Sequence, residues 1–134
     1  MNIRKAVESD KEFIKKLYKQ SSKYIGSFNL YWSWDKYIDG TAKHVFYISE
    51  EGGFMRYGYS KKYSAYVLHE IAVDNDTKQK GVGRTLFQKI PRPLMLKCNT
   101  DNDTGNAFYS RMGMTKVGKT QTNAGVQQNI WWIT

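Results

Sequence analysis

The sequence is poor in the residues that build disulfide frameworks, metal centres and membrane spans. Its 134 residues include one cysteine and two histidines. A single cysteine, Cys98, cannot form a disulfide within the chain, which favours a reducing compartment such as the cytoplasm, and two histidines do not make a metal site. No apolar run approaches the ~18 residues of a membrane-spanning helix, and the first residues, MNIRKAVESD, lack the apolar core of a signal peptide. We therefore expect no metal, no membrane span and no secretion.

What the sequence does contain is typical of one globular domain. Hydrophobic residues make up 40% of the chain and charged residues 25%, which are ordinary values for a folded protein. A chain of this length buries roughly two-thirds of its unfolded surface, so we expect residues 1–134 to form a single domain. The net charge of +9 indicates a polyanionic partner such as nucleic acid or an acidic protein surface. Alternatively, the lysines from Lys11 to Lys23 only form a solvated helix face.

Apolar periodicity predicts an α/β chain. A Ser9–Glu12 pair suits a capping box, and Phe13, Ile14 and Leu17 follow at helical spacing. Gly113 stands where a helix ends in the left-handed conformation. The predicted strands are 2–6, 44–49, 54–59, 66–73, 94–98, 114–118 and 126–133, and the predicted helices are 10–23, 33–38, 83–90 and 101–112.

The most informative stretch follows the strand at 66–73. Three polar residues, 74–76, close that strand, and Gly81 and Gly83 then open the next helix. Glycine lets backbone N–H groups approach an anion, and the beginning of a helix adds the positive end of its dipole. Basic side chains surround the turn, namely Lys78, Lys80 and Arg84. The turn therefore suits a pyrophosphate.

Known phosphate-binding motifs fit this turn to different degrees. The Walker A spacing, G-x-x-x-x-G-K-[ST], is absent. The dinucleotide fingerprint G-x-G-x-x-G is met at Gly81 and Gly83, with Asp101 downstream, but Leu86 replaces its third glycine and residues 74–80 separate the strand from the turn. On the turn alone, an ordinary glycine loop with solvated lysines stays an alternative.

The same stretch resembles the acetyl-CoA signature of the GNAT superfamily of N-acyltransferases. The loop is Lys78-Gln79-Lys80-Gly81-Val82-Gly83, with lysine in place of the family's first Gln or Arg. A second segment, from Asn102 to Met114, resembles the family's N-x-x-A-x-x-F-Y-x-x-x-G-F pattern, with Gly105 in place of the alanine and Met114 in place of the phenylalanine. Together with the flanking strands, the two motifs cover roughly the second half of the chain.

This resemblance implies both a fold and an activity. The implied fold is a single mixed, mostly antiparallel sheet of six or seven strands with about four helices on its two faces. The implied activity is direct transfer of an acetyl group from acetyl-CoA to a primary amine, with no metal and no covalent enzyme intermediate. The implied cofactor-binding residues are Ile71, Ala72, Val73, Lys78, Gln79, Lys80, Gly81, Val82, Gly83, Arg84, Asn102 and Phe108. Asn102 could instead serve only as a helix N-cap.

The implied chemistry needs a base, because an amine of pKa ~10.4 is almost wholly protonated at neutral pH. Glu70 is the first candidate base, at a position where several relatives carry such a glutamate, and a salt-bridged glutamate is the alternative. His69 is the second candidate, but it faces the other side of the strand unless a bulge intervenes. Tyr109 matches the family's tyrosine facing the thioester sulfur, or is a core tyrosine. Cys98 lies mid-strand and is not expected to be a nucleophile.

A second function stays open: a basic GNAT-fold module that binds or modifies nucleic acid. The lysine-rich first helix and the aromatic residues at 31–37 favour it. The sequence identifies neither the acceptor amine, which could belong to a protein, a small molecule or another compound, nor whether two chains pair as a homodimer.

Overall fold

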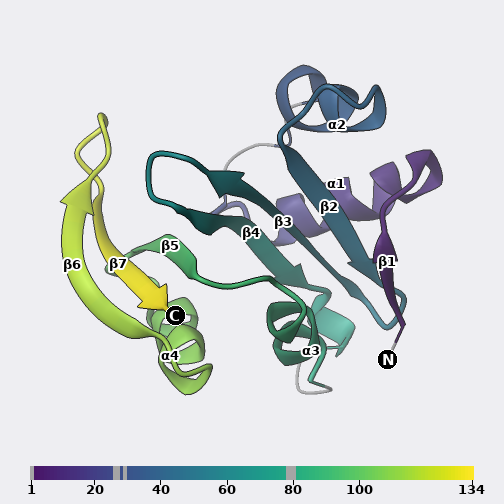
Figure 1. Cartoon of the computed structure of the whole chain (residues 1–134). Coiled ribbons are helices and arrows are strands. Elements are labelled where there is room, and N and C mark those ends of the chain that lie inside the picture. The colour runs from purple at the N-terminus through teal and green to yellow at the C-terminus, as the bar shows by residue number, and fades with distance from the viewer. Residues whose placement is uncertain (1, 26–27, 29, 78–80) are drawn as a thin grey trace.

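The computed structural model describes residues 2–25, 28, 30–77 and 81–134. Within these residues, seven strands form one sheet in the order β1-β2-β3-β4-β5-β7-β6. The strands are β1 (Ile3–Lys5), β2 (His44–Ser49), β3 (Gly53–Ser60), β4 (Ala65–Val73), β5 (Leu94–Asn99), β6 (Thr115–Gln121) and β7 (Gln127–Ile133). The β4–β5 pair is parallel and the other neighbouring pairs are antiparallel. The predicted mixed, mostly antiparallel sheet is confirmed (Figure 1).

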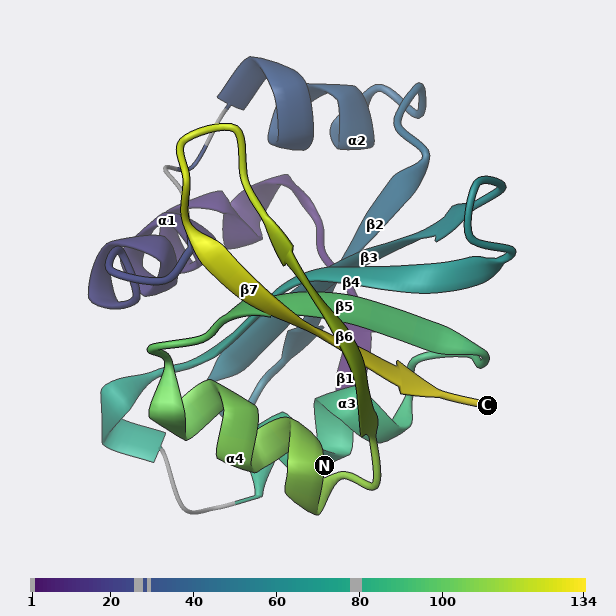
Figure 2. The same cartoon turned by 90° about the vertical axis from the view of Figure 1, so that its left-hand side faces the viewer.

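Helices cover both faces of this sheet. The α-helices are α1 (Lys11–Gln20), α2 (Lys36–Ile38), α3 (Val82–Gln88) and α4 (Asp103–Arg111), and the shorter turns are η1 (Glu8–Asp10), η2 (Leu30–Asp35) and η3 (Asn75–Thr77). Figure 2 shows α1 and α2 on one side of the sheet and α3 and α4 on the other. No helix in the described ranges is long and apolar enough to cross a membrane.

Each face of the sheet has its own hydrophobic core. On the α1 side, Ile14, Leu17 and Tyr18 of α1 pack with a cluster that includes Trp34, Phe46 and Phe54. The helical spacing of the α1 residues explains why they share one buried stripe. On the α3 side, the core residues are Met55, Tyr57, Leu68, Val82, Leu86, Phe87, Ile90, Leu94, Leu96, Cys98, Met114 and Trp131. The sheet is therefore buried on both sides over most of its length.

Several helix boundaries differ from the sequence prediction; α1, for example, ends at Gln20, where the sequence predicted residue 23. The Ser9–Glu12 capping box is wrong, because the η1 turn precedes α1 and the Asp10 carboxylate accepts the Val7 N–H at 2.7 Å instead. Asp10 is held there by an ion pair with Arg4, also at 2.7 Å. The predicted helix 33–38 is longer at its start, since the π-helical turn η2 runs into α2. In contrast, the left-handed Gly113 after α4 is confirmed, with φ +92°.

Candidate functional site

Strand β4 contains a β-bulge at His69. Arg56 of β3 lies opposite Glu70, whereas the next residue, Tyr57, lies opposite Leu68, so His69 is an extra residue in β4. Before the bulge, the Tyr66 N–H donates to the Pro93 carbonyl, on the β5 side, at 2.9 Å. Beyond it, the Asp74 N–H donates to the Gly52 carbonyl, on the β3 side, at 2.8 Å. In a regular strand, the N–H groups of residues 66 and 74 would point to the same edge. Here they point to opposite edges, so the bulge reverses the order in which successive N–H groups alternate between β3 and β5.

This reversal gives the second half of β4 unpaired N–H groups on its β5 edge. Counting back from Asp74, the Ala72 N–H faces β3, while the N–H groups of Ile71 and Val73 face the other edge. On that edge, β5 pairs with β4 only at Tyr66 and Val67. Beyond Val67, this edge of β4 has no strand partner among the described residues. An extended ligand can therefore bind in the gap between β4 and β5 as an added strand would.

Half-buried apolar side chains line this gap. A Cβ atom on Gly83 would lie 3.5 Å from both the Phe108 ring and the Val73 side chain, so these three residues meet. Phe108 and Tyr109 of α4 pack against Phe87, with ring centroids 6.0 and 6.5 Å from it. Phe87 is a core residue, whereas Val73, Phe108 and Tyr109 flank the core without being fully buried. An apolar ligand chain would complete the packing.

The glycine turn begins α3 as the sequence predicts. Gly81 has φ +77°, the left-handed region that favours glycine, and precedes the helix. The Val82 side chain is in the core and only 1% exposed, so only the backbone of Val82 could contact a ligand. The Arg84 side chain is exposed and could contact a ligand directly. Lys78, Gln79 and Lys80 lie outside the described residues, and their cofactor role stays a prediction.

Asn102 caps α4. Its side-chain oxygen accepts the Gly105 N–H at 3.0 Å, which satisfies a donor that the helix leaves free. A Cβ on Gly105 would come within 2.5 Å of the Asn102 amide nitrogen, which explains glycine where the family pattern has alanine. The N-cap alternative is therefore present in the structure, and cofactor contact by Asn102 stays a prediction.

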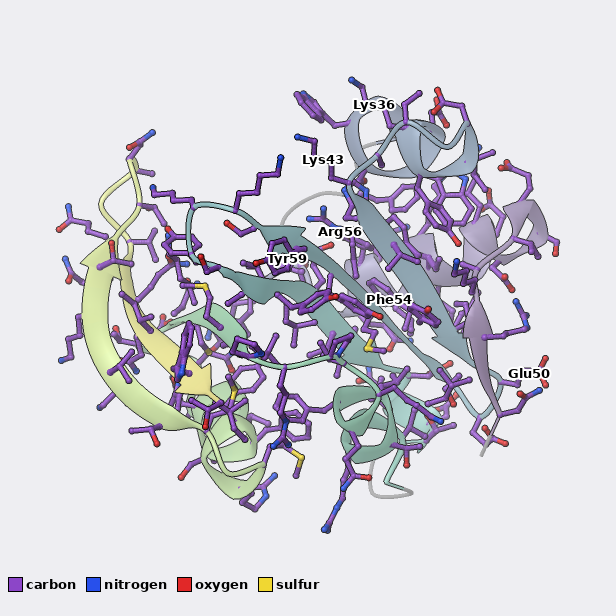
Figure 3. All side chains as sticks on the ribbon, in the orientation of Figure 1. Lys36, Lys43, Glu50, Phe54, Arg56 and Tyr59 are labelled. Atoms are coloured by element: carbon purple, nitrogen blue, oxygen red, sulfur yellow. The ribbon has the colours of Figure 1, made fainter. Side chains whose placement is uncertain are left out.

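A pocket of about 710 Å³ opens at the bulge, on the α1 side of the sheet. We call it the bulge pocket, and its lining residues are Tyr18, Trp32, Ser33, Lys36, Thr41, Ala42, Lys43, His44, Arg56, His69 and Glu70. Its size suits a small ligand. Figure 3 shows Lys36 and Lys43 near α2, Arg56 further along β3, and Glu50 far from all three. Because of the bulge, both His69 and Glu70 line this pocket. From the sequence, the two side chains were expected on one face of the strand only if such a bulge was present.

Glu70 is engaged by two neighbouring side chains. The Arg56 guanidinium donates to both of its carboxylate oxygens, at 2.7 and 2.6 Å, and the Tyr18 hydroxyl donates to one of them. Glu70 is thus the salt-bridged residue of the alternative interpretation, and its role as base stays a prediction. Neither Arg56 nor Tyr18 was predicted from the sequence to be part of the site. A lone arginine in the apolar strand 54–59 was the available signal, since such a charge needs a partner on the facing strand.

The two histidines of the chain lie side by side in the bulge pocket, with ring centroids 6.4 Å apart. His44 Nε2 donates to the Ser33 carbonyl at 2.9 Å. Partial desolvation, followed by the positive charge of Arg56, lowers the pKa of His69 below its ordinary value, although the side chain reaches solvent. Desolvation also lowers the pKa of His44. Both rings are therefore neutral at pH 7, the state that accepts a proton.

Tyr109 and Cys98 lie on the other side of the sheet. Burial raises the pKa of Tyr109 above its ordinary value, with Cys98 a smaller cause, so the hydroxyl stays protonated at neutral pH. That hydroxyl makes no hydrogen bond with the residues that the structure describes. Burial raises the pKa of the Cys98 thiol to about 11, which disfavours the nucleophilic thiolate. Within the described ranges, no three His, Cys, Asp or Glu side chains are grouped to hold a metal ion.

Sequence comparisons find similar proteins, although no family model matches the chain. The chain is 29% identical over 132 residues to the 5-NmdU N-acetyltransferase of Pseudomonas phage PaMx11, and the alignment covers 92% of this chain and 94% of that protein. It is 32% identical over 71 residues to the uncharacterized protein ML0378 of Mycobacterium leprae (strain TN), covering 49% of this chain. The chain spans only 20% of the length of ML0378.

Solved structures resemble the chain over nearly its whole length. Arabidopsis thaliana NAA60 in complex with a bisubstrate analogue superposes with a TM-score of 0.78 at 13% identity, covering 98% of this chain and 96% of NAA60. The same protein in complex with acetyl-CoA gives a TM-score of 0.76. An acetyltransferase of the GNAT family from Bacillus cereus ATCC 10987 gives 0.76 at 18% identity, covering 99% of this chain and 96% of that one. The chain therefore has the fold of the GNAT acetyltransferases, as its two sequence motifs predicted.

Proposed function

We propose that this chain is an N-acetyltransferase that transfers the acetyl group of acetyl-CoA to a primary amine held in the bulge pocket. The observation that carries the proposal is the bulge at His69. Within five residues of β4 it gives two unpaired N–H groups on the β5 edge and two titratable side chains in a pocket on the α1 face. Acetyl-CoA in the gap and the acceptor amine in the pocket would thus meet at the bulge.

The gap fits the arm of acetyl-CoA. Its N–H donors at Ile71 and Val73 match the amide carbonyls of such an arm, and its apolar wall at Phe108 matches the carbon chain. The glycine turn at Gly81 lies at the far end of the gap, where the pyrophosphate would sit. Solved proteins with this fold bind acetyl-CoA. We expect Lys78, Gln79 and Lys80 to contribute N–H groups and charge there.

Acetyl-CoA supplies an activated acetyl group as a thioester. A new N–C bond to the acceptor forms as the C–S bond breaks, yielding an amide and a thiol. The N–H of Ile71, the closest of the two donors to the pocket along the strand, would stabilise the negative charge that develops on the carbonyl oxygen. Because that donor is fixed in the sheet, it needs no reorganisation during the reaction.

His69 accepts the amine proton, directly or through one water. Its neutral ring has a free lone pair at pH 7, whereas the Glu70 carboxylate is already bound by Arg56 and Tyr18. Tyr109 donates a hydrogen bond to the departing sulfur. Since burial raises the pKa of Tyr109, hydrogen bonding rather than full proton transfer is its contribution. The departing thiolate takes a proton from water, and His69 releases to water the proton that it accepted from the amine, so the protons balance.

For the acceptor we propose the amine of 5-NmdU, the compound in the name of the phage relative. Nearly full-length similarity to that protein supports this choice. The bulge pocket also has planar side chains, Trp32, His44 and His69, against which a base ring can stack, and a carboxylate, Glu70, whose charge Arg56 balances. A basic pocket with ring-bearing walls suits a nucleoside better than it suits a polyamine, which is itself cationic.

The proposal is tested by incubating the chain with acetyl-CoA and one amine at a time. The amines are 5-NmdU, a polyamine and a peptide with a free N-terminus, and deoxyuridine is the control without the amine. We expect release of free CoA and a monoacetylated product with 5-NmdU, and neither with deoxyuridine. A chain that acetylates only the polyamine or the peptide would refute the acceptor, and one that acetylates none of them would refute the activity.

A further inference from the structure

A second pocket, of about 520 Å³, adjoins the bulge pocket on the same face of the sheet. Its lining residues are Lys43, His44, Gly58, Tyr59, Ser60, Tyr63, Val67, Leu68, His69, Met95, Lys97 and Gln128. Lys43, His44 and His69 line both pockets. The two pockets therefore adjoin at these three residues, and together we call them the groove, which extends from α2 to the β3–β4 hairpin. Figure 2 shows that hairpin extending beyond the helices.

Positive charge dominates this groove. Four cationic side chains line it, Lys36, Lys43, Arg56 and Lys97, against one carboxylate, Glu70. Glu70 is balanced by Arg56 alone. Lys43 makes no ion pair or hydrogen bond with the residues that the structure describes. Lys43 and Lys97 thus bring positive charge to the groove that no carboxylate of the described residues pairs with.

A pair of lysines at one end of the groove strengthens this conclusion. The Lys97 ammonium donates to the Tyr63 hydroxyl at 3.4 Å, and the Lys62 ammonium lies 5.3 Å from the centre of the same ring. These two cations, Lys97 first, lower the pKa of the Tyr63 hydroxyl. Two ammonium groups beside one neutral phenol repel each other, and an anion between them would relieve that repulsion.

Exposed aromatic rings stand along the same groove. Trp32 is 64% exposed at the rim of the bulge pocket, with the Lys36 ammonium 4.8 Å from its ring centre. Tyr63 lines the second pocket with its ring partly exposed, and the Lys97 ammonium lies 5.7 Å from the centre of that ring. Cationic side chains next to aromatic rings are the pattern that binds single-stranded nucleic acid, because lysines bind phosphates and rings stack on bases.

The lysines of α1 do not form such a surface. Three of them are in ion pairs, Lys11 with Glu8, Lys15 with Glu12 and Lys16 with Asp74. Their charges are therefore largely balanced. The nucleic-acid alternative was predicted from this helix and from the aromatic residues at 31–37. Of these, Trp32 lines the groove, and the helix does not.

We infer that the groove binds a single strand of nucleic acid, with the reacting nucleotide in the bulge pocket and its neighbours along the second pocket. This inference rests on the proposed function for the identity of the reacting group. It goes further in making the substrate a polynucleotide and not a free nucleoside. Coenzyme A occupies the opposite side of β4 in this account, so the two ligands bind together.

The test is binding of a labelled single-stranded DNA of about ten nucleotides, measured by fluorescence anisotropy at several salt concentrations. With phosphate contacts from Lys43, Lys62 and Lys97, we expect log K to fall with log salt with a slope of about −2, at about −0.7 per contact. Lys43→Gln and Lys97→Gln should each weaken binding several-fold and reduce the slope by about 0.7. Trp32→Ala should weaken binding roughly 5- to 100-fold, because it removes the exposed ring at the rim of the bulge pocket.

Lys89→Gln is the matched control. It removes the same charge from an exposed lysine at the end of α3, on the other face of the sheet. Binding unchanged by Lys89→Gln and unchanged by saturating CoA supports the groove. A slope near zero, an equal loss with Lys89→Gln, competition by CoA, or equal affinity for duplex DNA or for polyglutamate would each overturn it.

Acetylation of free 5-NmdU by the wild-type chain is measured alongside. Acetylation without DNA binding overturns this inference and leaves the proposed function standing. DNA binding through Lys43 and Lys97 without acetylation of 5-NmdU, free or within the oligonucleotide, supports the groove and overturns the proposed function.

Discussion

The two halves of β4 differ in what binds their edges. Before the bulge, residues 65–68 pair with β3 on one side and meet β5 on the other. After it, residues 70–73 pair with β3 alone, and their outer N–H groups have no strand partner in the described structure. One inserted residue, His69, produces this difference. The first half holds the sheet together, whereas the second half is left for a ligand, and the same insertion places two side chains in the bulge pocket.

The largest effect is expected from a substitution that fills the gap beside the second half of β4 and leaves the first half unchanged. In Gly83→Leu, the new side chain would enter the space between Val73 and Phe108, and we expect affinity for acetyl-CoA to fall at least ~100-fold, because the side chain fills the gap that the ligand needs. Isothermal titration calorimetry measures the change.

Gly81→Ala is the matched control for this substitution. Nothing lies within 4 Å of a Cβ at Gly81, so only the left-handed backbone opposes alanine, at about 1 kcal/mol, and affinity should change less than ~10-fold. Equal losses at the two glycines would mean that the turn, and not the gap, decides binding.

The next effect concerns stability. Glu70→Ala leaves the Arg56 guanidinium without its partner, and both side chains are less than a fifth exposed, so we expect a loss of about 3 kcal/mol in the free energy of unfolding. Glu50→Ala removes the ion pair between Glu50 and Arg4, whose side chains are more exposed, at 49% and 37% respectively. This substitution should lower the free energy of unfolding by less than about 1 kcal/mol. Urea denaturation compares them, and equal losses would show that Glu70 does not order the pocket.

A smaller effect is expected on turnover at the bulge itself. His69→Ala should lower kcat by about 10- to 100-fold with little change in the KM for acetyl-CoA. Because the pKa of His69 is lowered, its protonation should reduce wild-type activity only below the ordinary value of about 6.5. The His69→Ala profile should lack this acid limb. An acid limb that persists in His69→Ala but disappears in Glu70→Gln would return the role of base to Glu70.

The smallest effect is expected at Tyr109. Tyr109→Phe keeps the ring that packs on Phe87 and Phe108, and its hydroxyl has no partner among the described residues, so the melting temperature should barely change. Turnover should fall about 10-fold if the hydroxyl binds the leaving sulfur. The loss should shrink with a thioester of a more acidic thiol, and an equal loss for both thioesters would contradict the hydrogen bond.

Local signals in the sequence predicted the backbone of the glycine turn and of α4 better than the side-chain contacts of the bulge pocket. Gly81 and Gly113 are needed for their own backbone angles, and Asn102 caps the helix that it begins, so each can be recognised within a few residues. The bulge depends instead on the register between two strands, and Glu70 meets Arg56 across the sheet and Tyr18 from α1. Such partners are far apart in the chain, and periodicity in one strand cannot reveal them.

The positions of the charged side chains, like the contacts at the bulge, could not be predicted from local sequence. The net charge of +9 predicted an anionic partner, but not which lysines would face it. On α1 the neighbouring acidic residues Glu8, Glu12 and Asp74 balance the lysines. Lys43 and Lys97, which are isolated in the sequence, come together only because β2 and β5 border one groove.

Residue-resolved amide hydrogen exchange along β4, with and without CoA, tests the central claim most directly. In the free chain, Ile71 and Val73 should exchange fast, because their N–H groups face the open edge, and Ala72 should exchange slowly, because its N–H bonds to β3. Saturating CoA should slow Ile71 and Val73 at least ~10-fold and leave Ala72 unchanged. Protection of Ile71 and Val73 equal to that of Ala72 in the free chain, or no slowing when CoA is added, would contradict the account.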